Sequence, residues 1–194
     1  NSFNFASLLS IPLMFGIVST ANEFAPWFFG HEFGKTGKLM SIISPIIVLI
    51  AWSNVIGNQF LMPTGKIRGY TISVVIGAIA NFFFNLILIS RYHSIGAAIS
   101  TLVAEFSVTA VQFYLVRHDL KIKKMIYSTW KYFLSGLIMY FIIQYIGTLF
   151  ERRLISVIIQ FVTGIILYIS FLMLLKSNLF NYCYGYVKDK STRN

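Results

Sequence analysis

The sequence contains little charge and very few acidic residues. Only 11% of its 194 residues are charged, and only 6 of them are Asp or Glu. A soluble globular domain carries about 25% charged residues, so this chain has too few to cover the surface of such a domain. The shortage excludes an ordinary cytosolic enzyme domain, and a hydrophobic content of 57% excludes a disordered tail. The composition predicts a polytopic membrane protein.

Cysteine is nearly absent, and the motifs of common catalytic sites are missing. Cys183 is the single cysteine, and His31, His93 and His118 are scattered, so the sequence offers no disulfide framework and no metal-binding cluster. The sequence has no phosphate-binding GxxxxGK[ST] loop, no HExxH and no GxSxG. We therefore predict that the protein is not an enzyme and uses neither a metal nor a cofactor.

The chain is nevertheless basic, with 16 Lys and Arg residues and a formal net charge of +10. These residues occur in short runs between long apolar stretches. Such a pattern is typical of topology signals and of contacts with anionic lipid head groups, rather than of nucleic-acid binding. We therefore expect anionic membrane lipids as partners, and no nucleic acid.

Six apolar stretches are long enough to cross a bilayer as helices, which requires about 20 residues each. The stretches are continuous rather than alternating, and this favours α-helices over the strands of a barrel. The connections between them are short, so neighbouring helices should be antiparallel. The predicted spans are 1–30, 39–62, 69–90, 94–116, 132–150 and 154–175.

Lys and Arg are distributed unequally between the two sides that six spans would define. One side carries 11 of the 16 basic residues. Cytoplasmic loops carry the excess of Lys and Arg, so we predict a multi-pass protein of the cytoplasmic membrane with a cytoplasmic C-terminus. The predicted parts are a four-helix region (1–116), a basic cytoplasmic loop (117–131), a terminal helical hairpin (132–175) and a basic cytoplasmic tail (176–194).

Polar residues interrupt the first four predicted spans at helical spacing, so that within each span they share one face. In the last two spans, Gln144 and Gln160 are the only amide side chains. We therefore predict that the first four helices line a water-accessible cavity and that the last two face lipid. The candidate residues for a substrate path or a coupling ion are Glu23, Asn54, Asn58, Asn81, Asn85, Thr101, Glu105, Thr109 and Gln112.

These polar residues have two possible roles. For an individual Asn or Gln, the commoner role is a hydrogen bond between helices, which contributes about 0.6 to 2 kcal/mol. Glu105 differs, because a charged carboxylate near the middle of the bilayer costs several kcal/mol, so that it would be protonated, paired or hydrated. We expect a functional role for Glu105. Glu23 lies near an interface, where a charge costs little, and both roles stay open for it.

Five short motifs carry a resemblance to a known family. In chain order they are SIPLMFGI (10–17), WFFGHEF (27–33), WSNVIGNQFLMPTGK (52–66), GAIANFFFN (77–85) and SIGAAISTLVAEFSVTAVQFY (94–114). With these motifs in this order and spacing, the chain resembles the polysaccharide repeat-unit flippases of the Wzx type, within the multidrug/oligosaccharidyl-lipid/polysaccharide exporter superfamily. Residues 117–194 match that family only as a basic loop, two plain spans and a basic tail.

The resemblance implies a fold of two six-helix lobes related by a pseudo-two-fold axis, which rock to alternate access. This chain would form most of the C-terminal lobe, and its partner would be an N-terminal lobe of the same protein. Glu105 would be the acidic residue of the family motif, Asn81 and Asn85 its Asn pair, and Pro12 and Gly16 a hinge. The hairpin 132–175 would be an extra pair of helices, which in related lipid flippases shapes a groove for the lipid tail.

The resemblance also implies a function without covalent chemistry, namely the flipping of undecaprenyl-diphosphate-linked oligosaccharide across the membrane by alternating access. A cation-coupled multidrug exporter shares this fold and is an alternative. A membrane-embedded glycan polymerase or ligase is a further alternative, although the predicted outer loops 31–38, 91–93 and 151–153 are short for such an enzyme. A structural six-helix membrane subunit is a fourth hypothesis, and the polar faces argue against it.

Overall fold

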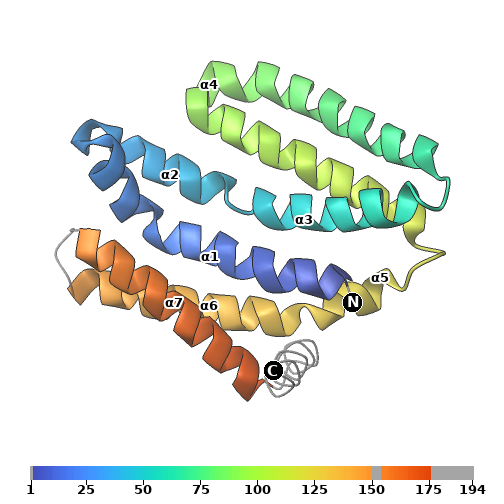
Figure 1. Cartoon of the computed structure of the whole chain (residues 1–194). Helices are drawn as coiled ribbons and strands as arrows, with labels where there is room; N and C mark the ends of the chain where they lie inside the picture. The colour runs from blue at the N-terminus through green and yellow to red at the C-terminus, as the bar shows by residue number, and fades with distance from the viewer. Residues whose placement is uncertain (1, 150–153, 176–194) are drawn as a thin grey trace, which may run out of the picture.

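The computed structural model describes residues 2–149 and 154–175. These residues form helices joined by short connections, without a β-strand among them, which confirms the all-α fold class. Most of the helices run roughly along one direction (Figure 1). The elements in chain order are α1 (Ser2–Phe29), η1 (His31–Phe33), α2 (Gly34–Ile43), α3 (Ile46–Ile56), the π-helical turn η2 (Gly57–Leu61), α4 (Ile67–Val116), α5 (Ile122–Ser128), α6 (Trp130–Leu149) and α7 (Leu154–Leu174).

Within the described residues, five helical segments are long and apolar enough to cross a membrane. This supports a membrane location, but the sequence predicted six spans. The predicted spans 69–90 and 94–116 both fall in the single element α4, and the predicted loop 91–93 is helical on either side of His93. The five segments are Ser2–Phe29, Gly34–Leu61, Ile67–Val116, Ile122–Gly147 and Val157–Leu174.

Two other boundaries also differ from the prediction. The predicted span 39–62 begins earlier, at Gly34, and passes through a turn at Ser44 and Pro45 between α2 and α3. The predicted loop 117–131 contains the helix α5. The predicted tail 176–194 lies outside the described residues.

The helix α4 reverses its direction at His93. Its 50 residues are helical except at His93, where φ is 51° and ψ is −125°. The helix therefore folds back into two arms, 67–92 and 94–116, which lie side by side (Figure 1). Among the described residues, His93 is the only one other than glycine with a positive φ. Such a conformation costs about 1–3 kcal/mol, so the packing between the arms has to offset it.

Small residues let the two arms approach closely. A Cβ atom added at Gly96 would lie 2.1 Å from the carbonyl oxygen of Leu88, and one added at Gly77 would lie 2.3 Å from Cγ2 of Val108. Each pair is nearly symmetric in sequence about His93. The two arms are therefore antiparallel, with a fixed register.

The remaining helices pack around α1. This helix contacts α2 and α3 on one side and α6 and α7 on the other (Figure 1). The helices α2 and α3 separate most of it from α4, which it meets at Phe3 and Phe113. The main apolar core lies where α1, α3, α6 and α7 meet. Its buried members are Ile11, Val48, Tyr132, Met139, Ile143, Tyr168 and Leu172.

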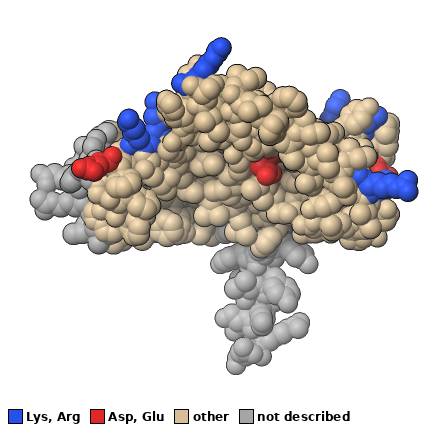
Figure 2. Space-filling view, turned by 90° about the horizontal axis from the view of Figure 1, so that it is seen from above, with Lys and Arg blue, Asp and Glu red and all other residues tan. Residues whose placement is uncertain are grey.

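Charged side chains leave a broad uncharged band across the molecule. In the view from above, Lys and Arg lie near the left and right ends and at one point of the upper edge, and the broad surface between them is uncharged apart from one acidic patch (Figure 2). This agrees with the sequence, because Lys35 and Lys38 lie in the first turns of α2, Lys66 and Arg68 at the start of α4, and Arg91 at its reversal. A membrane protein needs such an apolar band between two polar surfaces.

A hydrogen bond joins α1 to α7 at a proline. Pro12 lies inside α1 and has no N–H, so the carbonyl oxygen of Leu8 lacks its usual helical donor. The hydroxyl of Tyr168 donates a hydrogen bond to that oxygen at 3.0 Å. Because lipid supplies no donor, this bond satisfies an acceptor that would otherwise be costly to bury. Pro12 and Gly16 both lie within the continuous helix α1, and their role as a hinge stays a prediction.

We predict that His93→Gly raises the free energy of unfolding of the full-length protein by about 1 kcal/mol, because glycine adopts a positive φ without strain. His93 is exposed, so the change removes little packing. Thermal unfolding in detergent measures the effect. Tyr92→Gly, at the adjacent exposed and helical position, is the control and should lower stability by about 1 kcal/mol. Equal effects of the two substitutions on stability would contradict the claim that the backbone of His93 is strained.

We predict that Tyr168→Phe lowers the free energy of unfolding by about 1 kcal/mol, because it removes the donor to the Leu8 carbonyl. Pro12→Ala restores a backbone N–H to that carbonyl, so Tyr168→Phe should have a smaller effect in the Pro12→Ala background. A double-mutant cycle on detergent-solubilised protein measures this coupling. Additive effects of the two substitutions would show that the proline and the tyrosine act independently.

Candidate functional site

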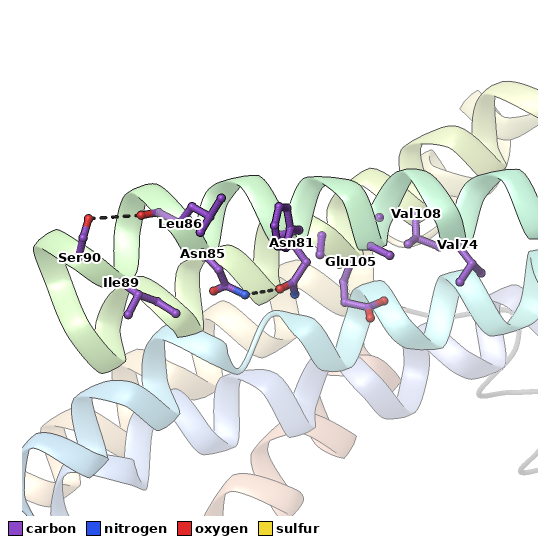
Figure 3. A pocket seen from close by; sticks show the side chains of 12 residues that line it. Val74, Asn81, Asn85, Leu86, Ile89, Ser90, Glu105 and Val108 are labelled. Carbon is purple, nitrogen blue, oxygen red and sulfur yellow. Dashed lines mark hydrogen bonds between the residues drawn. The ribbon is translucent and has the colours of Figure 1, made fainter.

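An open groove of about 860 Å³ runs along the two arms of α4 (Figure 3). Most of its lining is apolar, with Val74, Phe82 and Leu86 from the first arm and Val108 from the second. The groove lies along the arms where they fold back on each other. Gly77, also in its lining, marks a point of close contact, because a Cβ atom there would lie 2.3 Å from Cγ2 of Val108.

Three of the predicted polar residues meet in this groove. Asn81 and Asn85 lie one turn apart on the first arm, and Glu105 lies on the second. The side-chain amide nitrogen of Asn85 donates a hydrogen bond to Oδ1 of Asn81. The register set by Gly77 and Val108 places Glu105 at about the level of Asn81, and the three side chains project to the same side (Figure 3).

These side chains retain unused hydrogen-bonding capacity. Oδ1 of Asn85 is buried and accepts no hydrogen bond. The half-buried carboxylate of Glu105 has no ion-pair partner in 2–149 or 154–175, where the ion pair formed is that of Lys66 with Asp119 at 2.5 Å. A carboxylate and amides in an apolar groove provide acceptors and donors for hydroxyl groups, or a site for a proton or cation. They provide no cationic side chain.

The other polar residues of the second arm lie away from the groove. The hydroxyl of Thr109 lies 3.2 Å from the carbonyl oxygen of Leu49 and 2.9 Å from that of Glu105, and its one proton is shared between these two acceptors. Gln112 is fully buried and donates to Oγ of Ser73 at 3.2 Å. Thr109 therefore joins α4 to α3, and Gln112 joins the two arms of α4. Thr101 donates to the carbonyl oxygen of Ala97 in its own helix at 3.0 Å. On the second arm, Glu105 thus lines the groove, whereas the polar side chains of Thr101, Thr109 and Gln112 form hydrogen bonds within or between helical segments.

The candidates on α1 and α3 also lie outside this groove. Asn58 donates to Asn54 at 3.0 Å, and both are exposed on α3 and η2. Glu23 on α1 accepts a hydrogen bond of 2.8 Å from the buried amide of Gln160 on α7. A Cβ atom added at Gly147 would lie 2.5 Å from Oε1 of Glu23, so the backbone of α6 packs directly against this pair. The structure therefore does not bring all nine predicted residues to one site.

Some relevant residues were missed by the sequence analysis. Gln160 was assigned to a lipid-facing helix, but its burial and its bond to Glu23 place it between helices. Tyr168 supplies the donor that Pro12 predicts for the Leu8 carbonyl, and no local sequence pattern singles this tyrosine out. The sequence contains both signals, since Gln160 is a lone amide in an apolar span and Pro12 lies four residues after Leu8.

Comparisons with protein-family models, with curated proteins and with solved structures find no match for this chain. The family resemblance therefore stays a prediction that rests on the five motifs. No group of three or more His, Cys, Asp and Glu residues within 2–149 and 154–175 could hold a metal ion. The chemistry available in the groove is thus that of Glu105 and its two neighbouring amides.

We predict that Gly77→Ala lowers the free energy of unfolding by about 1–3 kcal/mol, because its Cβ would overlap Cγ2 of Val108. Val108→Ala removes that atom, so it should recover part of the loss when combined with Gly77→Ala. Gly16→Ala is the matched control, because a Cβ there meets nothing within 4 Å. Thermal unfolding in detergent compares the wild type, Gly77→Ala, Gly77→Ala with Val108→Ala, and Gly16→Ala. A Gly77→Ala variant as stable as the control would contradict the close contact of the arms.

Proposed function

We propose that this chain is part of a transporter that flips undecaprenyl-diphosphate-linked oligosaccharide across the cytoplasmic membrane by alternating access. The observation that supports this proposal best is the Glu105 carboxylate. It has no ion-pair partner among the described residues, and it lies beside the Asn81–Asn85 pair in an open groove of an apolar helix. The five motifs that resemble Wzx-type flippases point to the same function.

In this proposal the two arms of α4 cross the membrane separately, so five long helices make six crossings. Each arm has more than the 20 or so residues that a crossing requires. The basic ends of the helices then lie on alternate sides, with the more basic side in the cytoplasm. The groove lies along these two crossings, at the depth where a polar head group needs a hydrated path.

An oligosaccharide suits the chemistry of the groove. Sugar hydroxyl groups both donate and accept hydrogen bonds, and a carboxylate and two amides can serve both roles. Apolar walls such as Phe82 and Leu86 can contact the carbon faces of sugar rings. The groove is open on one side, and the N-terminal lobe expected from the resemblance would supply the opposite wall.

A second groove suits the lipid part of this substrate. It has a volume of about 450 Å³, and Leu9 and Leu13 of α1 and Phe161 and Ile165 of α7 line it. All four side chains are apolar and are exposed in the structure by 47–62%, so a hydrocarbon chain would cover them. This agrees with the lipid-tail groove that the resemblance implies for the terminal hairpin.

A cation-coupled multidrug exporter is the second candidate. The Glu105 carboxylate lies in a largely apolar groove without a described counter-ion, and a lipophilic cation would also suit such a site. The two candidates share the groove and differ in substrate. Dye efflux from cells that overproduce the full-length protein distinguishes them from each other.

We predict that Glu105→Gln in the full-length protein reduces export of lipid-linked oligosaccharide about tenfold or more, without changing protein abundance. The substitution removes charge-assisted hydrogen bonds, each of which contributes about 1.5–3 kcal/mol. The measurement is the amount of lipid-linked repeat units that accumulate in cells at matched expression. Glu32→Gln, which removes the same charge from an exposed residue in η1, is the control and should export normally.

Two results would count against the proposal. Equal accumulation in Glu105→Gln and wild-type cells would remove Glu105 from the transport path. Normal polysaccharide export together with lost efflux of cationic dyes would favour the multidrug exporter instead.

A further inference from the structure

A separate cavity of about 510 Å³ lies at one end of the molecule, where the start of α1, the end of α3 with η2, and α5 come together. These three segments lie near one another at the end of the molecule that holds the N-terminus (Figure 1). The apolar part of the wall includes Phe3, Ile56 and Phe60. The cavity lies at helix ends, so in a membrane it would open at the polar surface rather than in the middle of the bilayer.

Two lysines line this cavity and have no described acidic partner. Lys121 precedes α5 and Lys124 lies in its first turn, and both are exposed. The nearest acidic residue in sequence, Asp119, is already engaged by Lys66 at 2.5 Å. The cavity therefore carries two positive charges that the described part of the chain does not neutralise.

Polar side chains complete the rim and hold it in place. The hydroxyl of Ser128 lies 2.5 Å from Oδ1 of Asn4 on α1 and 2.6 Å from the carbonyl oxygen of Met125, and its one proton is shared between these two acceptors, which links α5 to α1. This bond leaves the amide N–H groups of Asn4 as donors, and Gln59 contributes a second amide to the lining. The next residue, Thr129, is 1% exposed and anchors the end of α5. The two lysines are thus carried by a segment that is fixed to the rest of the fold.

We infer that this cavity binds the phosphate-bearing head group of an anionic lipid. The phosphate would lie between Lys121 and Lys124, with the amides of Asn4 and Gln59 as further donors, since ammonium and amide groups both bind phosphate oxygens. The first carbons of the lipid would contact the apolar wall, which a free anion would leave uncovered. Lysines near a membrane surface attract anionic lipids in this way. The inference requires a membrane location but not the flippase function.

Native mass spectrometry of the full-length protein in detergent tests this inference. Dioctanoyl phosphatidylglycerol is the probe, and dioctanoyl phosphatidylcholine and inorganic phosphate are the comparison ligands. We predict that Lys124→Gln weakens phosphatidylglycerol binding about fivefold and that Lys121→Gln with Lys124→Gln weakens it further. Lys123→Gln is the matched control, because it removes the same charge from the same short helix outside the cavity, and it should bind as the wild type does.

Three outcomes would overturn the inference. Equal weakening by Lys123→Gln and Lys124→Gln would mean a diffuse basic surface rather than this cavity. Equal affinity for phosphatidylglycerol and phosphatidylcholine would mean that the negative charge is not recognised. Displacement of phosphatidylglycerol by an equal concentration of inorganic phosphate would mean that the cavity takes a free anion, without a contribution from the lipid's apolar part.

Discussion

The close contact between the two arms of α4 is the interaction on which the candidate site depends. Lipid offers no hydrophobic drive for helices to associate, so small residues and interhelical hydrogen bonds have to hold them. Gly96 against Leu88 and Gly77 against Val108 provide this contact and fix the register. That register places Asn81 near the level of Glu105. The packing between the arms also has to offset the strained backbone of His93, and the reversal at His93 in turn brings the arms together.

The polar residues of the membrane-spanning helices serve two purposes that the structure separates. Thr109 and Gln112 satisfy acceptors and donors between helices, and Tyr168 does the same for a carbonyl that Pro12 leaves without a donor. Oε1 of Gln112 and Oδ1 of Asn85 are alike in accepting no hydrogen bond. Glu105 differs, since its carboxylate has no ion-pair partner among the described residues and lines the open groove. This carboxylate is the reason for proposing function at the groove rather than along the whole polar face.

The sequence predicted the helical fold well because the bilayer sets the length of an apolar helix. The span predicted for 1–30 is observed as Ser2–Phe29. The sequence predicted a reversal between 91 and 93, but not that the helix continues up to a single strained residue on both sides, because His93 adopts a positive φ without glycine or proline beside it. The division of the polar face was also beyond the sequence, since residues four apart share a face but meet different neighbours. The pair of Glu23 and Gln160 joins residues 137 apart in sequence, which local periodicity cannot reveal.

The reversal at His93 also bears on how the site is assembled during folding. The contacts between the arms join residues that are close in sequence near the turn, so the entropy lost in closing each successive pair is small. We therefore expect the two arms to pair as a hairpin before the distant helices dock. Asn81 and Glu105 belong to that hairpin, so the polar groove is a local product of one stretch of chain. The helices α2 and α3 then pack against α4, and α1, α6 and α7 pack beyond them.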